Sequence, residues 1–494
     1  MTRINNVDDA MKKMLKFIFL LLCCAIYFPA SATGAMADSV QRPQMTAEQA
    51  SRYALATVLS ASGTIGDETS DPWDPISDSS AKQSTAQPDY VVDWRVAGDG
   101  AHQFQTLQAC INHIANLSAD SNVAPIAQRR RQIILVMPGI YHELLYIPAL
   151  PISLTLTGAD PDPSKTVITA DLDATVTSTE YLQRYGQQFS AAPDAITTMV
   201  QSVKNHATIG TDSTASVWIR NDGFQARNLT IENGYQLRAD CLRSGCHDTL
   251  VPGEVVHHQA VALLVDGADR VQFDHVRVLG HQDTLYLKSA PHNVATRIFF
   301  NQSLIEGDVD FIFGDATAYF YQSEIKSLSD RPVSYMAAPS TNYQTRYGFV
   351  FNACQFTTDD STSSGTQFYL ARQWFHNQKC TPYHAVNVAG YSCRPGDTDG
   401  YTSPKGTISR SVLETVGKVA ILNSRLGKHF DVRHLWSNWN SPGALAYRPA
   451  QFTSDAYWEN LLNADIDPVT FMGYPKKRAP SEWFIAEFNN SVDE

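Results

Sequence analysis

The residues best suited to chemistry lie in two short β-prone stretches. GHQDTLYL (280–287) contains Gln282 followed by Asp283, and GDVDFIFGDA (307–316) contains Asp310 between apolar residues. A carboxylate among residues that usually face a core or a cleft is costly unless it is paired or used. A lone aspartate in an apolar strand is more often a hydrogen-bonded turn residue than a catalyst, so a catalytic role needs further groups.

Those groups are an amide and a guanidinium: Gln259 in QAVALLV and Arg372 in YLARQW. Hydrolysis of an ester needs a nucleophile, oxyanion donors, a proton for the leaving alcohol and a base for the second step. Asp310 is the candidate nucleophile, with the fork of Arg372 on one carboxylate oxygen while the other attacks. Asp283 is the candidate general acid and later base, because two nearby carboxylates titrate apart. Gln259 and Gln282 are the candidate oxyanion donors.

Gln282 and Asp283 are neighbours, so their side chains would face opposite ways on a regular strand. Both can serve one site only if the backbone between Gly280 and Thr284 leaves β geometry. Gly280 tolerates unusual dihedral angles and would allow the bend. We therefore expect a turn or bulge there that directs both side chains toward Asp310.

Short strands recur from residue 133 onward, and helical periodicity nearly disappears. Several segments place a polar or small residue at a turn-like position before an apolar one, a few tens of residues apart: RNLTI, DHVRV, NQSLI, QSEIK, NACQF and NSRLG. Such repeats without alternating helices are typical of a parallel β-helix, whose coils bury their inner faces by stacking. A β-sandwich or propeller is the alternative, disfavoured because no hairpin turns such as Asn-Gly separate the strands. An amphipathic helix over 104–117 would close the open N-terminal end.

Residues 1–37 have the pattern of a cleaved export signal. A positive segment from Met11 precedes an apolar segment from Ile18 that is too short to span a bilayer, and small residues follow. A lipoprotein anchored at Cys23 or Cys24 is the alternative, disfavoured because the residue before Cys23 is leucine. We expect an exported protein, whether secreted, periplasmic or on the cell surface, with membrane association only if it is lipidated.

The remaining chain divides into two parts. Residues 38–91 begin with a short helix, which a capping box at 46–49 predicts. They continue with a Ser/Thr/Pro-rich stretch over 61–87 that we interpret as a linker or long surface crossing. Residues 92–494 form the β-helix domain with a C-terminal extension.

Composition restricts the partners. A formal net charge of −12 argues against nucleic acid and anionic membrane surfaces. No metal or other cofactor is expected, because the adjacent His257 and His258 would point to opposite faces of a strand.

Six cysteines follow the signal, and an even number in an exported chain suggests disulfides. The expected pairs are Cys241–Cys246 and Cys380–Cys393, and buried thiols are expected at Cys110 and Cys354.

Several blocks of the chain are similar to the pectin methylesterases, and the resemblance covers about residues 92–430. It rests on GDGAHQFQTLQACI (98–111), PGIYHE (138–143), QAVAL (259–263), GHQDTLYL (280–287), GDVDFIFGDA (307–316) and YLARQW (369–374). It is greatest with the longer bacterial members. The resemblance implies a right-handed parallel β-helix and hydrolysis of the methyl esters of polygalacturonate, with pectin or methylated oligogalacturonides as substrate, by a monomer.

The resemblance also assigns Tyr286, Phe313 and Trp374 to the sugar subsites, although ordinary core positions are the alternative for each. The chain departs from the family pattern at Asp308, where a small residue is common, and at Asp315, where Asn is common. Ala371 and Gln373 likewise replace the usual Gly and Pro. Two insertions, over about 171–216 and 375–410, have no counterpart in the family pattern.

Other functions on the same fold remain alternatives. A non-catalytic glycan-binding β-helix would leave the carboxylates, Arg372 and both glutamines without a role. A pectate lyase or polygalacturonase would depolymerise its substrate, and a lyase would need an acidic calcium cluster, for which Asp397 and Asp399 are the only thin candidate. A thioesterase is a further alternative, because some relatives of the longer branch have that activity.

Overall fold

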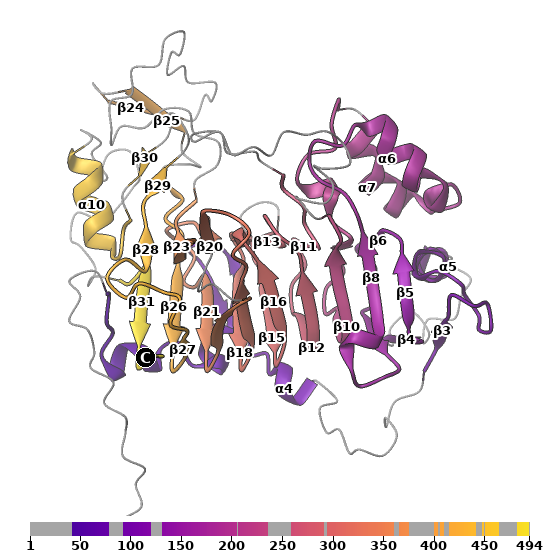
Figure 1. The fold of residues 1–494 in the computed structure, drawn as a ribbon, viewed down its shortest axis with the longest axis horizontal. Helices are drawn as coiled ribbons and strands as arrows, with labels where there is room; N and C mark the ends of the chain where they lie inside the picture. The colour runs from indigo at the N-terminus through magenta and orange to yellow at the C-terminus, as the bar shows by residue number, and fades with distance from the viewer. Residues whose placement is uncertain are drawn as a thin grey trace, which may run out of the picture. The chain divides into compact units, whose positions relative to one another are not determined.

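The structure of the protein, a computed structural model, consists mostly of parallel strands. It describes residues 42–78, 92–119, 131–204, 206–235, 258–290, 294–359, 365–374, 400–403, 406–409, 414–440, 447–448, 450–463 and 482–493. Successive coils lie side by side in Figure 1, with β3 and β4 at one end and β31 at the other. The predicted right-handed parallel β-helix is confirmed.

Three parallel sheets form its walls. The first sheet contains β3 (Trp94–Val96), β4 (Gln132–Val136), β7 (Leu154–Gly158), β10 (Gln225–Asn233), β12 (Val271–Leu279), β15 (Arg297–Asn301), β18 (Thr317–Tyr321), β21 (Phe349–Asn352), β26 (Val419–Leu422) and β31 (Ile485–Phe488). The second contains β5 (Gly139–His142), β8 (Thr166–Ala170), the C-terminal halves of β10 and β12, β16 (Leu304–Gly307), β19 (Glu324–Ser327), β22 (Gln355–Thr358), β27 (Arg425–Leu426) and β32 (Ser491–Val492). The third, which carries the candidate site, contains β6 (Leu145–Ile147), β9 (Val217–Ile219), β11 (Leu263–Asp266), β13 (Leu285–Lys288), β17 (Val309–Gly314), β20 (Val333–Pro339), β23 (Gln367–Arg372) and β28 (Trp436–Ser437).

Shorter elements lie outside these walls. The additional strands are β1 (Ala61–Thr64), β2 (Thr69–Ser70), β14 (Val294–Ala295), β24 (Gly400–Ser403), β25 (Gly406–Ser409), β29 (Trp439–Asn440) and β30 (Tyr447–Arg448). The helices are α2 (Ala47–Ser51), α3 (Leu55–Val58), α4 (Pro75–Asp78), α5 (Leu107–Ala119), α6 (Ser178–Tyr185), α7 (Asp194–Lys204) and α10 (Ser454–Asn463), with 3₁₀ turns η1 (Pro163–Lys165), η2 (Gly186–Phe189) and η3 (Asp212–Thr214). Within the described residues, no helix is long and apolar enough to cross a membrane.

The corner between the first and second sheets explains the repeated motifs. One residue of each motif has a positive φ, between 46° and 56°: Asn228, His275, Gln302, Gln322, Ala353 and Asn423. Asparagine tolerates this left-handed conformation better than most residues. Side chains also link successive corners, as between the Asn489 amide and Asn423 Oδ1 at 3.0 Å. Each motif therefore marks the point where one coil turns between sheets.

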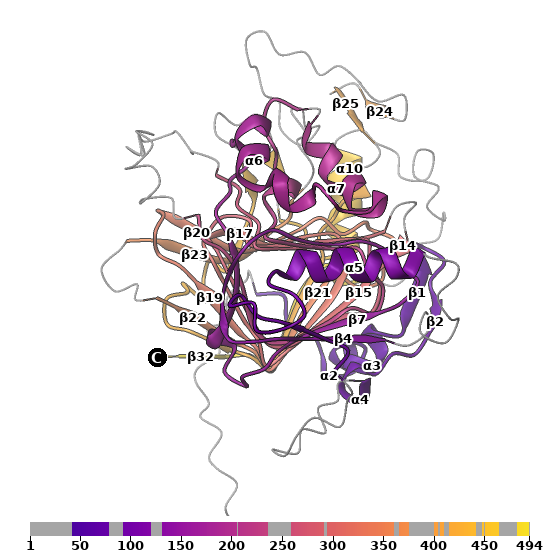
Figure 2. The ribbon, with the colours of Figure 1, turned by 90° about the vertical axis from the view of Figure 1, so that its right-hand side faces the viewer.

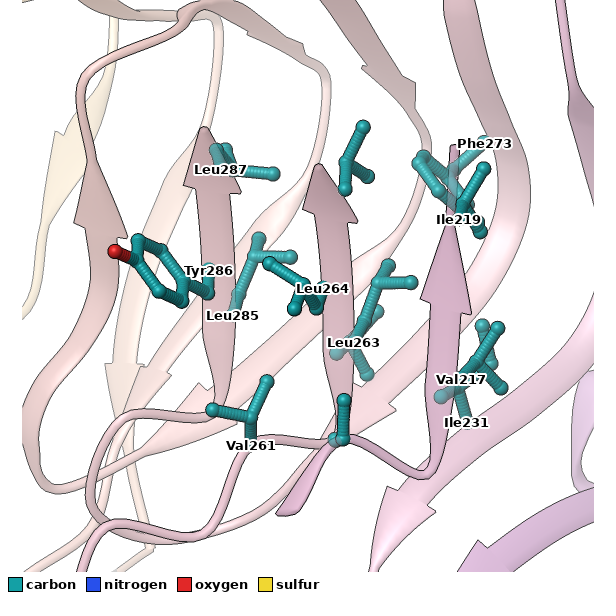
Figure 3. Close-up of a cluster of buried hydrophobic side chains, with 14 of the residues drawn as sticks. Val217, Ile219, Ile231, Val261, Leu263, Leu264, Phe273, Leu285, Tyr286 and Leu287 are labelled. Carbon is teal, nitrogen blue, oxygen red and sulfur yellow. The ribbon is translucent and has the colours of Figure 1, made fainter. Parts of the chain in front are cut away.

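The interior is filled by rows of residues from successive coils. Rings stack along the first sheet, with centroids 4.6 Å apart for Phe273 and Phe300 and 4.8 Å apart for Phe300 and Phe320. On β13, Leu285 and Tyr286 both belong to the buried cluster of Figure 3. As neighbours on one strand, their side chains lie on opposite faces of the third sheet.

The N-terminal end of the β-helix is closed by α5, as predicted for 104–117. Figure 2 shows α5 across that end of the sheets, and it contacts β3 and β6. Glu143 of the PGIYHE block caps it, because its carboxylate accepts hydrogen bonds from the amides of Leu107 and Gln108, both at 2.9 Å.

Residues 42–78 pack against the β-helix. The predicted capping box is present at the start of α2. The linker interpretation of 61–87 is wrong over 61–78, where β1, β2 and α4 form and Trp73 is buried; the rest of that stretch lies outside the described residues. The fully buried Arg297 explains the packing, because it donates to Asp71 Oδ2 at 2.8 Å and to the Leu59 carbonyl at 3.0 Å.

The insertion over 171–216 packs on the N-terminal coils. It supplies α6 and α7, and Tyr181 of α6 contacts Tyr146 of β6 through their hydroxyl groups, 2.7 Å apart. Of the insertion over 375–410, the described residues are those of β24 and β25.

Candidate active site

Asp310 and Arg372 form a bidentate ion pair on the third sheet. Asp310 lies in β17, where the pairing with β20 shifts register between Val309 and Ile312 and Asp310 takes a φ of 52°. Arg372, at the end of β23, donates from Nε to Oδ1 at 2.8 Å and from Nη2 to Oδ2 at 2.6 Å. The expectation that Arg372 would hold only one carboxylate oxygen is therefore wrong. A carboxylate has about four lone-pair sites, so each oxygen keeps a lone pair for attack.

The guanidinium of Arg372 is itself held between two aromatic rings. Its Cζ lies 3.9 Å from the centroid of Tyr335 and 4.6 Å from that of Trp439. Burial opposes its charge, but Asp310 outweighs burial and raises the pKa of Arg372 above its ordinary value. Arg372 therefore stays a fixed cation. Tyr335 and Trp439 lie outside the six sequence blocks that resemble the family, so their contact with Arg372 could not be predicted from sequence.

The turn predicted before β13 is present, but it bends at a different residue. Asp283 itself takes a left-handed φ of 65°, and its amide donates to the Val309 carbonyl at 3.0 Å. Gly280 is needed instead for close approach, because a Cβ there would lie 2.8 Å from Thr284 Oγ1. The bend places Asp283 beside the residue that precedes Asp310.

The surroundings of Asp283 favour its protonated form. Burial raises the pKa of Asp283 well above its ordinary value, and the charge of Asp310 raises it further, against the opposing effect of Arg372. A buried carboxylic acid next to a paired carboxylate is the arrangement that divides acid and nucleophile between two aspartates.

Gln282 is oriented by the neighbouring coil. Its Oε1 accepts a hydrogen bond from the amide of His258 at 3.2 Å, which leaves both amide N–H bonds for other partners. Gln259 lies in that same coil, whose Ala260 amide donates to the Gln282 carbonyl at 3.0 Å. Both glutamines therefore lie in adjacent coils next to Asp283, as a pair of oxyanion donors requires.

A buried group not identified from sequence lies behind Gln282. His258 Nδ1 contacts the carboxylate of Asp173, and the hydroxyl of Tyr235 lies 3.0 Å from the same nitrogen. The histidine was considered only as a metal ligand, and Asp173 belongs to the insertion without a family counterpart. Sequence could not reveal their contact, because 85 residues separate them.

The three predicted subsite aromatics lie together beside the ionic groups. Tyr286 and Phe313 are opposite each other on β13 and β17 and stack with centroids 4.0 Å apart. Trp374 meets Phe313 edge-on at 5.9 Å. Phe313 is only 4% exposed and Tyr286 9%, so both also pack in the sheet. The alternatives of core packing and site lining are therefore compatible here.

A charged cluster lies next to the turn of Asp283. His281 Nδ1 lies 3.2 Å from Asp330 Oδ2 and 3.7 Å from Asp308 Oδ2, and Arg331 Nε lies 3.2 Å from the same Asp308 oxygen. His281, Asp308 and Asp330 are metal-ligand types within 4.8 Å of one another. The positive Arg331 occupies the side of Asp308 that a cation would use, so the cluster balances its charge with its own side chains.

The predicted buried thiols are confirmed, since Cys110 and Cys354 are free and buried. The other predicted groups fall outside the described residues. They are the export signal at 1–37, both disulfide pairs (Cys241–Cys246 and Cys380–Cys393), and the calcium candidates Asp397 and Asp399.

Comparison with known proteins shows which family this chain resembles. The family model described as Pectinesterase matches residues 192–381, which include every predicted site residue. A pectinesterase from Sitophilus oryzae is 30% identical over 362 residues, covering 73% of this chain and 81% of the relative. This chain belongs to the pectinesterase family.

A second pectinesterase, from Ralstonia solanacearum, is 32% identical over 366 residues, again covering 73% of this chain and 81% of the relative. The solved structure of rice weevil pectin methyl esterase has a TM-score of 0.61 at 24% identity, covering 92% of this chain and 97% of that one. At that identity the structural likeness shows the shared fold alone.

Proposed function

We propose that this pectinesterase-family protein hydrolyses the methyl esters of pectin, releasing methanol and pectate, through an acyl-enzyme on Asp310. The observation that carries the proposal is the bidentate Arg372–Asp310 pair next to Asp283, whose pKa is raised well above its ordinary value. A carboxylate paired with Arg372 and a carboxyl group whose burial favours the protonated form are therefore both present at this site.

The first step forms the acyl-enzyme. A free lone pair of the Asp310 carboxylate attacks the ester carbonyl, and the oxyanion receives hydrogen bonds from the amides of Gln259 and Gln282. As the tetrahedral intermediate collapses, the proton of Asp283 passes to the departing methoxide, which leaves as methanol. Arg372 holds the Asp310 carboxylate in position through its two hydrogen bonds throughout.

The second step restores the enzyme. Asp283, now a carboxylate, takes a proton from water as the oxygen of that water attacks the acyl carbonyl. The products are the free uronic acid, the Asp310 carboxylate and a protonated Asp283. The uronic acid then releases its proton to solvent, so the enzyme returns to its starting protonation state.

The substrate proposal rests on the row of Tyr286, Phe313 and Trp374. Aromatic faces next to a charged site suit sugar rings, whose C–H faces are apolar and whose edges are polar. We propose that methylated galacturonate units, in polymer or oligomer, bind along this row.

Export is also part of the proposal, since the signal-like residues 1–37 fit an enzyme whose polymeric substrate lies outside the cell. Disulfides Cys241–Cys246 and Cys380–Cys393 and a monomeric state are proposed with it. Intact mass of the exported protein before and after thiol alkylation tests cleavage and pairing together.

The decisive assay measures methanol release from esterified pectin together with polymer length. An esterase releases methanol and leaves the length unchanged, whereas a lyase or polygalacturonase shortens the chain. Methanol release on pectin with no hydrolysis of an acyl-CoA supports the esterase over a thioesterase. Binding of pectin without any product would instead favour the glycan-binding alternative.

A further inference from the structure

A charged cluster lies where the turn before β13 meets β17 and β20. The amide of Asp308 donates to the His281 carbonyl at 3.1 Å, which ties the start of β17 to the turn of Asp283. The Asp308 carbonyl accepts from the Tyr335 amide at 2.9 Å and from Ser334 Oγ at 2.7 Å, which ties it to β20. Asp308 therefore lies at the junction of the turn before β13, β17 and β20.

The side chains at this junction are charged and largely enclosed. Asp308 is fully buried and Arg331 is 8% exposed, and their ion pair measures 3.2 Å. His281 bridges Asp308 to Asp330. Burial alone would lower the pKa of His281, but its bonds to both aspartates outweigh this and raise the pKa to about 9. His281 is therefore protonated at neutral pH and lies against Asp308 together with Arg331.

We propose that Asp308 and Arg331 are positioning residues that set the proton affinity of Asp283 from behind the site. The idea rests on the proposed function, because it concerns the acid of that reaction. Buried charges act on the pKa of a nearby buried group through a low dielectric, and salt screens them only weakly. A paired Asp308 and Arg331 nearly cancel at Asp283, so loss of either partner unmasks the other.

The charged and titratable groups that act on Asp283 give the direction. Asp310 and Asp308 raise the pKa of Asp283, and Arg372 and Arg331 lower it, on top of burial as the largest cause. Asp283 also acts on Tyr286 of β13, whose own pKa is raised well above its ordinary value, chiefly by burial, so Tyr286 stays neutral. His281, which contacts Asp308, is a further titratable group of this cluster.

The test is the pH dependence of kcat for methanol release from esterified pectin. Activity should fall as pH rises through the pKa of Asp283, because the acid must be protonated. Asp308→Asn should move this alkaline limb down by about 0.5–1 pH unit, and Arg331→Gln should move it up by a similar amount. A purely structural role would lower kcat in both variants without shifts of opposite sign.

Matched controls separate the possible failures. Glu306→Gln removes the same charge two residues from Asp308, but Glu306 pairs with Lys326 on the second sheet at 2.7 Å and should leave the limb in place. The double variant Asp308→Asn/Arg331→Gln removes both charges and should return the alkaline limb close to that of wild type. It replaces Arg331→Gln as the test if that single variant fails to fold. If the wild type is active but the alkaline limb does not move in Asp308→Asn or Arg331→Gln, this inference alone is overturned. A wild type that releases no methanol would overturn the proposed function.

Discussion

At the scale of single residues, the two aspartates share an uncommon backbone. Asp283 and Asp310 have φ values of 65° and 52° in the left-handed region. Such residues cost on the order of 1–3 kcal/mol each when the surroundings do not favour them, and they gather at functional sites. Here each bend turns a carboxylate out of the alternation of its strand. The proposed reaction needs both carboxyl groups at one ester, which regular β geometry would not allow for Gln282 and Asp283 together.

Gln282 and Asp283 should differ in kind when replaced. Gln282→Ala should lower kcat for methanol release by about 10²–10³-fold with an unchanged pH profile, as expected for loss of one oxyanion donor. Asp283→Ala should lower kcat and also remove the alkaline limb, because the titrating acid is gone. A pH–rate series on both variants checks this. A pH profile shifted equally in the two would contradict the division of roles.

At the scale of elements, the cap of α5 should make stability depend on pH. Burial raises the pKa of Glu143 from 4.5 to about 7, against the lowering effect of its bonds from Gln108 and Leu107. A raised native pKa means that the stabilisation is complete below the unfolded value near 4.5 and is lost as pH rises toward 7. The shift corresponds to about 3 kcal/mol of unfolding free energy.

Glu143→Gln should flatten that dependence. The glutamine does not titrate, and its Oε1 can keep one amide bond at the helix N-terminus while the other is lost. The variant should therefore be less stable at pH 5 but lose less stability between pH 5 and 7 than wild type. Thermal or urea unfolding at both pH values measures the difference. Equal losses in the two proteins would show that Glu143 does not carry this titration.

The elements differ in how far sequence could predict them. The corner motifs predicted the coils because a polar or small residue at a turn just before an apolar strand residue is a local signal, and α5 followed from its apolar stripe. The Asp310–Arg372 pair was predictable from residue types, but its bidentate geometry depends on the register of β17, β20 and β23. The bend was assigned to Gly280 because glycine is the usual bend residue, whereas tertiary contacts place it at Asp283.

Other contacts were invisible because they join distant segments. Asp173 meets His258 across an insertion, and Asp71 meets Arg297 across 226 residues. The composition of 61–78 indicated a linker, since it lacks an apolar period, yet a few buried residues and one ion pair suffice to dock it. Local pattern contains no information on such pairings.

At the scale of the whole molecule, the N-terminal segment should contribute stability without affecting chemistry. Asp71→Asn removes a charge from beside the fully buried Arg297, whose remaining carboxylate partner is Asp269 at 2.5 Å. We expect a loss of about 1–3 kcal/mol in unfolding free energy, because a buried cation loses a partner. The kcat for methanol release at 25 °C should stay within about twofold of wild type, since Asp71 lies on the first-sheet side.

The control for this variant is Asp67→Asn, an exposed aspartate in the same segment. Its unfolding midpoint should match wild type. If Asp71→Asn and Asp67→Asn unfold alike, the segment is not held by the Arg297 pair.

The complete reaction should need no metal. The groups assigned to it are side chains, and the charge of the His281 cluster is balanced by Arg331. Methanol release should therefore survive exhaustive dialysis against EDTA. Loss of activity that calcium restores would show that a metal site takes part in turnover.

The measurement that tests the central claim most directly is methanol release by Asp310→Asn, with sample mass checked for deamidation. Asparagine has the same shape but cannot form the acyl intermediate, so activity should fall below the detection limit while thermal unfolding remains cooperative. Asp315→Asn, in the same sequence block, is the matched control and should remain active, because an amide oxygen can still accept the hydrogen bond from the Ser289 amide. Retention of more than about a few per cent of activity by a deamidation-free Asp310→Asn would contradict the acyl-enzyme on Asp310.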